Sequence, residues 1–319
     1  MRPMTICVTG GTGFIGRHFI KRCEREDGVK LKLLTRRPPE AKLLSANIQF
    51  VQGDLLDYES LLKFVDHGCV LVHLAYLFQG SRAQNIEAVE YLAKACRAKG
   101  ISRFVHLSSV GVTGPSPDPI VTESTRCQPD SDYEVTKLEL ESLIVQLLGD
   151  ACDVAMLRPT CVFGEGGDKV VKLVEDLSSD PAIVSYLKRS LFHRRRLNLV
   201  CAENVVEALW FLSTFKNALG GERFIVSDDD VSENNYLDVS DYLGKHLSIP
   251  RPSWPRVFFA PWLLPIMLKL TGRAARNPQT NYSSEKLSRL GYQSAIGFED
   301  GLKLFVEWYK QQSNNKIAQ

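Results

Sequence analysis

Short apolar runs alternate with helical patterns over the first 110 residues, and this alternation restricts the fold more than any other feature. The predicted elements lie at residues 5–8, 14–26, 31–34, 48–51, 70–75, 86–98 and 104–107. Apolar runs without polar alternation are typical of strands covered on both faces, as in a parallel sheet. Right-handed βαβ crossovers then predict an α/β fold with a doubly wound parallel sheet, whose ligands bind at the carboxyl ends of the strands.

Two more elements extend this pattern, an amphipathic helix over 133–148 and a strand over 153–157. After Arg158-Pro159 the segments become longer and less regular, with helices predicted at 169–178, 203–215 and 298–310. We therefore predict a sheet domain over residues 1–160, completed by later segments, and a smaller C-terminal part over 161–319 that binds the substrate.

The composition is that of a globular protein without a strong overall charge. Hydrophobic residues make up 44% of the chain, and 39 Lys and Arg stand against 37 Asp and Glu, so no global field would attract nucleic acid or anionic lipid. The eight cysteines are dispersed without a CxxC pair, which favours a reducing cytoplasm and predicts no metal site. No charged and apolar leader precedes the strand at Thr5, so we expect no signal peptide.

The longest apolar stretch covers residues 257–270 and contains Pro261 and Pro265. It is too short and too broken to span a bilayer, and a buried lid helix is the favoured interpretation. The alternative is contact with a membrane surface. The apolar residues that would make this contact, beside Lys269, are Phe258, Phe259, Trp262, Leu263 and Leu264.

A glycine-rich loop, Thr9 to Gly16, follows the first strand directly and opens the first helix. Gly10 permits a tight turn, Gly13 lets the backbone approach a pyrophosphate, and Gly16 allows close packing of helix and strand. The helix N-terminus, at Phe14 and Ile15, offers free amides to the anion. In this context an ordinary glycine-rich turn is the weaker alternative, and the loop predicts dinucleotide binding.

The second strand ends in Leu34-Thr35-Arg36-Arg37, where an enzyme specific for NAD would carry an acid for the ribose hydroxyls. Arginine can pair with a 2′-phosphate instead. Arg36, together with Arg37, therefore favours NADP as the cofactor, with NAD as the alternative. A solvated loop arginine is the competing interpretation.

Tyr133 and Lys137 lie four residues apart on one face of the predicted helix. A phenol is a poor base at neutral pH, and we expect the neighbouring ammonium to lower its pKa. Tyr282 and Lys286 have the same spacing, so spacing alone does not identify the site. Only the first pair follows a sheet strand, the one that ends in Leu107-Ser108-Ser109, and it alone is predicted to face a nicotinamide.

Several motifs along nearly the whole chain resemble those of the extended short-chain dehydrogenases/reductases, also called the NAD-dependent epimerase/dehydratase family, which have a Rossmann fold. They are TGGTGFIG, GDLLD at 53–57, VHLAY at 72–76, FVHLSSVGVTG at 104–114, YEVTK, and LRPTCVFG at 157–164. The resemblance implies that Ser109 hydrogen-bonds the reacting oxygen, Tyr133 transfers the proton and Lys137 grips the nicotinamide ribose.

The same resemblance implies cofactor contacts elsewhere. Asp54 and Leu55 would meet the adenine, Ala75 would lie beneath the ribose, and the backbone after Pro159 would hold the carboxamide, while Asn85 would only brace the site. Two alternatives stay open from the residues themselves, because Ser108 is a rival to Ser109, and Asp54 also fits a simple Asx-turn. The family further implies a homodimer through the helix that carries Tyr133.

Two features bear on the reaction. Dehydratases of this family carry an Asp-Glu pair after the serine or threonine, and Val110-Gly111 stand there instead. The absence of this acid pair disfavours dehydration, and NADP is the cofactor of net reductions. Together they favour a ketone reductase that interconverts a ketone and a secondary alcohol. An NAD-dependent nucleotide-sugar epimerase is the alternative, and a non-catalytic cofactor-binding protein ranks third.

Two stretches bear on the substrate, and they point to different small molecules. The run from His193 to Val200 resembles the stretch that contacts a diphosphate in members acting on nucleotide sugars, although it also fits a solvated basic turn. Cys201-Ala202-Glu203-Asn204 replaces the usual Val-Asp-Asp. Residues 257–270 are similar to the lid of members acting on sterols and flavonoids. A nucleotide-linked sugar is the first expectation and a hydroxysteroid or dihydroflavonol the alternative.

Overall fold

The computed structural model describes residues 4–37, 47–250, 254, 255, 257–259 and 277–317. The chain forms two compact units. The first contains residues up to 112 together with 129–158 and 205–224, and the second contains 113–128, 159–204 and the chain from 225 onward. The chain therefore leaves the first unit and returns to it twice, and it leaves a third time after residue 224.

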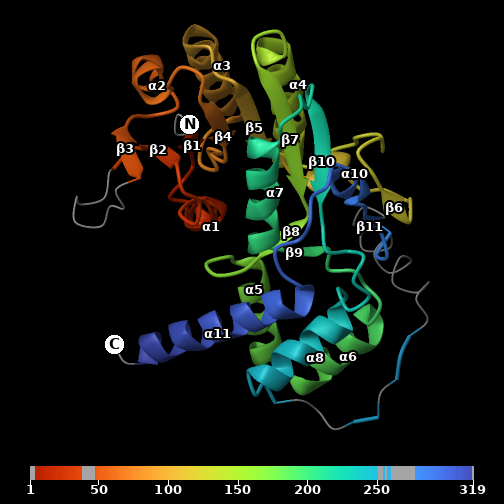
Figure 1. The fold of residues 1–319 in the computed structure, drawn as a ribbon. Coiled ribbons are helices and arrows are strands. Elements are labelled where there is room, and N and C mark those ends of the chain that lie inside the picture. The colour runs from red at the N-terminus through yellow and green to blue at the C-terminus, as the bar shows by residue number, and fades with distance from the viewer. Residues whose placement is uncertain (1–3, 38–46, 251–253, 256, 260–276, 318–319) are drawn as a thin grey trace. The chain divides into compact units, whose positions relative to one another are not determined.

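The first unit is built on a seven-stranded parallel sheet in the order β10-β7-β5-β4-β1-β2-β3 (Figure 1). Its strands are β1 (Met4–Thr9), β2 (Val29–Thr35), β3 (Ile48–Gln52), β4 (Val70–His73), β5 (Arg103–Leu107), β7 (Asp153–Pro159) and β10 (Glu222–Val226). Their central residues are mostly buried except in the edge strand β3, which confirms strands covered on both faces.

Helices cover both faces of this sheet (Figure 1). On one face lie α2 (Tyr58–Phe64), α3 (Arg82–Lys99) and α4 (Asp132–Leu148), whose apolar side chains share one core with β4, β5 and β7. On the other face lie α1 (Phe14–Cys23) and α7 (Ala202–Thr214), where the Arg22 guanidinium pairs with Glu207 and stacks 4.8 Å from the ring centre of Trp210.

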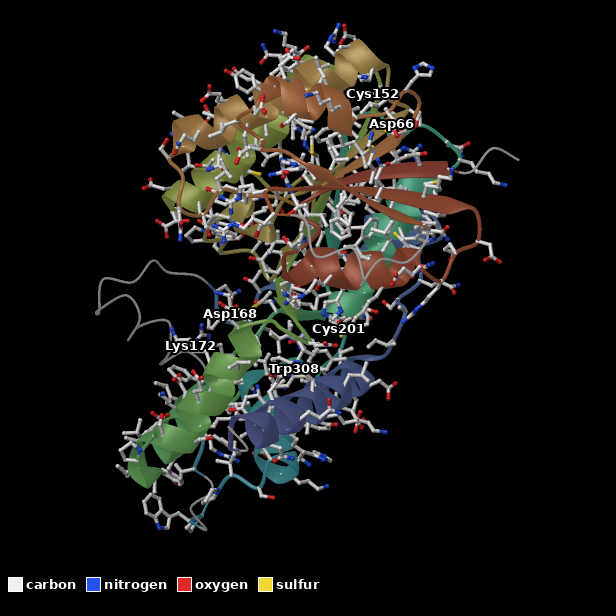
Figure 2. The ribbon with its side chains drawn as sticks, turned by 90° about the vertical axis from the view of Figure 1, so that its left-hand side faces the viewer. Asp66, Cys152, Asp168, Lys172, Cys201 and Trp308 are labelled. Atoms are coloured by element: carbon white, nitrogen blue, oxygen red, sulfur yellow. The ribbon has the colours of Figure 1, made fainter. Side chains whose placement is uncertain are left out.

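The strand order reverses direction between β1 and β4, since the chain runs outward to β3 on one side and to β10 on the other. Connections that leave these two strands diverge, which opens a crevice at their carboxyl ends. Thr9 and His73 are paired in register at this point. Asp66 and Cys152, which precede β4 and β7, mark the opposite, amino-terminal edge of the sheet (Figure 2).

The second unit packs helices around short strand pairs. Its elements are β6 (Ile120–Val121), β8 (Cys161–Phe163), α5 (Lys169–Ser179), α6 (Ala182–Phe192), β9 (Leu199–Cys201), α8 (Tyr236–His246), β11 (Asn281–Tyr282), α10 (Glu285–Arg289) and α11 (Phe298–Ile317). Its core joins α5, α8 and α11 to the end of β9, where Cys201 lies close to Gly301, and Trp308 packs at the edge of this core (Figure 2).

The predicted strands and helices of the sheet occur with small shifts at their ends, whereas the helices α2, α6, α8 and α10 were not predicted. The prediction of a buried lid helix over 257–270 is wrong for residues 257–259, which are exposed. Residues 260–270 lie outside the described part of the chain. All eight cysteines are free thiols. Among the described residues, no helix has the length and apolarity to cross a bilayer.

Candidate active site

The loop between β1 and α1 has the conformation that a dinucleotide phosphate needs. Gly10 has φ +73°, and a Cβ there would lie 2.7 Å from the backbone nitrogen of Ala75. A Cβ on Gly16 would overlap the carbonyl oxygen of Gly10. Helix α1 begins at Phe14 without a side-chain cap and without an acid in its first turn, so its N-terminal amides are available to an anion. The loop therefore fits the cofactor that the sequence predicts.

Gly16→Ala tests this loop. Because the new methyl group would meet the Gly10 carbonyl, the loop must shift, and we expect the Kd for NADPH to rise at least about tenfold, a loss of about 1.4 kcal/mol. Nicotinamide fluorescence would measure it. Gly297→Ala is the matched control, because its Cβ would meet only Asp300, at 3.5 Å. Unchanged NADPH binding by Gly16→Ala would remove the loop from the cofactor site.

Three buried polar side chains hold the loops at this edge. Thr9 Oγ1 lies 2.6 Å from His73 Nδ1 and thereby links β1 to β4. Burial, and secondly the charge of Lys137, lower the pKa of His73 to about 3, so this imidazole is neutral. Asn85 bonds both the amide and the carbonyl of Leu77 and also the carbonyl of Ser81. Asn85 thus braces the chain after β4, as expected.

Arg36 and Arg37 follow β2 and are both exposed, as a contact with a 2′-phosphate requires. Asp54 Oδ1 accepts a hydrogen bond from the amide of Leu56 at 2.9 Å, which is an Asx-turn. This structural role is therefore real, and contact between Asp54 and the adenine stays a prediction. Leu55 is buried in the core, and its role beside the adenine stays a prediction as well.

Tyr133 lies in the first turn of α4, and a capping box between Ser131 and Glu134 fixes where this helix begins. Our expectation that a neighbouring ammonium lowers the pKa of Tyr133 is wrong for this structure. Burial, followed by the Tyr76 and Glu134 charges, raises the pKa of Tyr133 to about 12. The phenol is therefore protonated at neutral pH.

Lys137 lies one turn further along α4 and is buried. Its ammonium does not bond Tyr133. Nζ donates to the carbonyl of Leu107 at 2.8 Å and lies 5.0 Å from the ring centre of Tyr76. Burial lowers the pKa of Lys137 to about 8, while the Glu141 charge opposes this shift.

This pKa predicts a pH dependence. If Lys137 must be charged to bind the nicotinamide ribose, kcat/KM should fall as the pH rises through about 8, because the ammonium then loses its proton. The pH profile of kcat/KM with NADPH measures this, and Lys286→Met, a lysine of the second unit, is the control. A flat profile between pH 7 and pH 9 would contradict a role for charged Lys137.

The two serines after β5 have different environments. Ser108 is buried and donates to Glu141 Oε1 at 2.5 Å. Ser109 is only partly buried, and its Oγ accepts a hydrogen bond from the amide of Gly111 at 3.1 Å. A Cβ on Gly111 would lie 3.0 Å from Glu134 and 3.3 Å from Ser109 Oγ. The Ser109 turn therefore packs against the start of α4, and Ser109 is the serine left for a ligand.

Sequence reasoning missed three side chains around the tyrosine and the lysine. Tyr76 and Phe78 follow β4, and both rings contact Tyr133, at centre distances of 5.0 Å and 6.1 Å. Glu141 is fully buried and forms a bidentate pair with Arg158. Glu141 could have been found from its spacing, since it follows Lys137 by four residues on the same helix face.

Other sequence candidates lie in the second unit. Tyr282 belongs to β11 and Lys286 to α10, so this second pair does not share a helix face. Arg196 donates to the carbonyls of Asp229, Val231 and Ser232.

After Pro159, the amide of Thr160 donates to the carbonyl of Val226, and the amide of Cys161 donates to the carbonyl of Asn198. A contact between this stretch and a carboxamide stays a prediction.

The sheet order and the glycine loop define an enzyme of the Rossmann class that uses a nicotinamide cofactor. Residues 6–227 match the NAD dependent epimerase/dehydratase family, and the chain belongs to this family. The resemblance seen in the sequence is thereby confirmed.

Named relatives differ in what they act on. The chain is 27% identical to a UDP-glucose 4-epimerase of Vibrio cholerae, over 98% of the chain and 97% of that protein. It is 26% identical to sterol demethylase protein B of Methylococcus capsulatus, over 90% of the chain and 89% of that protein. One solved structure with a similar fold is the UDP-glucuronic acid 4-epimerase of Bacillus cereus in complex with UDP-glucuronic acid and NAD. Its TM-score is 0.69 and its sequence is 22% identical, over 97% of this chain and 100% of that chain.

Proposed function

We propose that this protein is an NADP-dependent oxidoreductase that reduces a ketone to a secondary alcohol. The observation that carries the proposal is the protonated Tyr133, held beside buried Lys137 at the start of α4, in the same unit as the glycine loop. A phenol that keeps its proton at neutral pH is suited to donate it. The preference for net reduction rests on Arg36, which favours NADP, and on Val110-Gly111, which replace the acid pair of the dehydratases.

In this reaction Tyr133 donates its proton to the substrate oxygen as negative charge develops there, and Ser109 Oγ donates a hydrogen bond to the same oxygen. Lys137, oriented by the Leu107 carbonyl, holds the cofactor ribose. The bound nicotinamide supplies the hydride. The rings of Tyr76 and Phe78 contact the ring of Tyr133, a residue that remains 36% exposed.

Dehydration is disfavoured by the same loop. Gly111 stands where dehydratases carry the second acid of their Asp-Glu pair, and any side chain there would press on Glu134 and Ser109. The loop therefore lacks the acid pair, and a side chain at this position would require Glu134 to move by a few tenths of an ångström.

Cofactor preference is tested by titrating the protein with NADPH and NADH. We expect NADPH to bind at least about tenfold more tightly, because a charge-assisted pair with Arg36 contributes about 1.5–3 kcal/mol. Arg36→Ala should remove this difference. Lys30→Ala, at the exposed start of the same strand, is the control. Equal affinity for both cofactors in the wild type would refute NADP preference and favour an NAD-dependent epimerase.

A nucleotide-linked keto sugar is the first substrate to test. The UDP-glucose 4-epimerase relative and the exposed Arg194 and Arg195 support it, although Arg196 is committed to backbone carbonyls and is not available to a diphosphate. A lipophilic ketone is the second candidate. The sterol demethylase relative and the exposed apolar residues at 257–259 favour it. NADPH oxidation with each class of ketone decides between them.

A further inference from the structure

Lys137 is a buried ammonium with few conventional partners. The residue is only 3% exposed, yet among the described residues its Nζ makes a single hydrogen bond, to the carbonyl of Leu107 at 2.8 Å. An ammonium group has three donors. Two donors are therefore left for other partners, and the proposed function assigns the cofactor ribose to this side chain.

The nearby carboxylate of Glu141 does not offset the charge of Lys137 by itself. Both oxygens of Glu141 accept hydrogen bonds from Arg158, one also accepts from Ser108, and Arg223 Nε lies 3.6 Å from Oε2. Two guanidinium groups therefore already share this negative charge. Glu141 raises the pKa of Lys137, but burial has the larger effect and lowers it to about 8.

Three other titratable side chains near Lys137 are uncharged at neutral pH. His73 on β4 and His106 on β5 are partners in register, and their buried rings stack at 5.2 Å. Burial, and secondly the charge of Lys137, lower the pKa of both imidazoles. Tyr133, one turn earlier on α4, is a protonated phenol. None of these three groups therefore supplies a negative charge to the ammonium.

The ring of Tyr76 is the remaining contact of Lys137. Its centre lies 5.0 Å from Lys137 Nζ and also 5.0 Å from the centre of the Tyr133 ring, which stands at 78° to it. The face of an aromatic ring is negative and attracts a cation, more strongly where the cation is removed from water. Tyr76 therefore contacts both side chains that the proposed reaction uses.

The backbone around Tyr76 is held in place by hydrogen bonds. The amide of Phe78 donates to the carbonyl of Tyr76 at 3.1 Å, which makes a tight turn. Between them, Leu77 is bonded by the buried Asn85 at both its amide and its carbonyl. These bonds fix the segment that carries the Tyr76 ring after β4.

We propose that Tyr76 is a positioning residue, whose ring face holds the ammonium of Lys137 in its charged form for the cofactor ribose. This inference rests on the proposed function, in which Lys137 binds that ribose. Without the ring, the carbonyl of Leu107 would be the one close partner of the ammonium among the described residues. Lys137 would then lose its proton at a lower pH.

Titration of the protein with NADPH, or with NADH if it binds more tightly, tests the proposal without a substrate. Nicotinamide fluorescence gives the Kd over about pH 6.5–9.5, and for the wild type it should rise as the pH passes through about 8. Tyr76→Leu removes the ring, so this rise should begin about 0.4–1.5 pH units lower. Tyr76→Phe keeps the ring face and should keep the wild-type profile.

Tyr58→Leu is the matched control. The ring of Tyr58 lies 4.4 Å from Nζ of Lys94 and belongs to the same unit, so the change removes an equivalent contact from another lysine. Its pH profile should be that of the wild type. If Tyr76→Leu does not bind the cofactor at pH 7, Tyr76→Met repeats the test, because it fills more of the space without an aromatic face.

Three results would overturn the proposal: a wild-type profile for Tyr76→Leu, an equal displacement by Tyr76→Phe, or an equal displacement by Tyr58→Leu. A wild-type Kd that stays constant over this range would remove charged Lys137 from the cofactor site and overturn the proposed site as well. If the profile moves as expected but no ketone is reduced, the role of Tyr76 would be supported and the proposed reaction refuted.

Discussion

Replacing Tyr133 by phenylalanine is expected to lower kcat by about 10²–10⁴-fold, because the substrate oxygen loses its proton donor. NADPH affinity should stay within about twofold, since the ring contacts with Tyr76 and Phe78 do not need the hydroxyl. Single-turnover oxidation of NADPH with an active ketone measures the first effect, and nicotinamide fluorescence measures the second.

Tyr282→Phe is the matched control, because Tyr282 has the same spacing to a lysine but lies on β11 in the second unit. It should retain wild-type turnover. If Tyr133→Phe also turned over at the wild-type rate, the catalytic assignment would fail. The protein would then be better described as a cofactor-binding protein that retains the fold of its family.

The sheet and the glycine loop could be predicted because their signals are local. Each buried strand is a continuous apolar run, and the loop must carry glycine at Gly10, where φ is positive and the Ala75 backbone is in contact. The second unit could not be outlined in this way. It is assembled from residues 113–128, 159–204 and the chain after 225, and no local pattern shows which separated segments pack together.

The electrostatics of Tyr133 also required the structure. Its spacing to Lys137 correctly places both on one helix face, but spacing does not show where the ammonium points. Lys137 Nζ donates its hydrogen bond to the carbonyl of Leu107 and not to Tyr133. Burial raises the pKa of the Tyr133 phenol. The pKa of Tyr133 therefore moves in the direction opposite to the one expected from the sequence.

A buried carboxylate links this site to the core. Glu141 is fully buried, accepts two hydrogen bonds from the Arg158 guanidinium and one from Ser108, and lies one helical turn beyond Lys137. Its negative charge raises the pKa of Lys137 against the effect of burial. Glu141 is therefore a positioning residue, which supports both the fold around Arg158 and the charge of Lys137.

Glu141→Gln should have two measurable effects. Leaving the Arg158 charge buried without its carboxylate should lower the free energy of unfolding by about 3–5 kcal/mol in urea denaturation. The pKa of Lys137 should also fall further, so the alkaline decline of kcat/KM should move to a lower pH.

The control for this prediction lies on the same helix. Glu139 pairs with Arg82 at 2.6 Å, but both side chains are exposed, so Glu139→Gln should cost no more than about 1 kcal/mol and leave the pH profile unchanged. If Glu141→Gln lost stability but kept the wild-type pH profile, Glu141 would support only the fold, and the charge of Lys137 would depend on other groups.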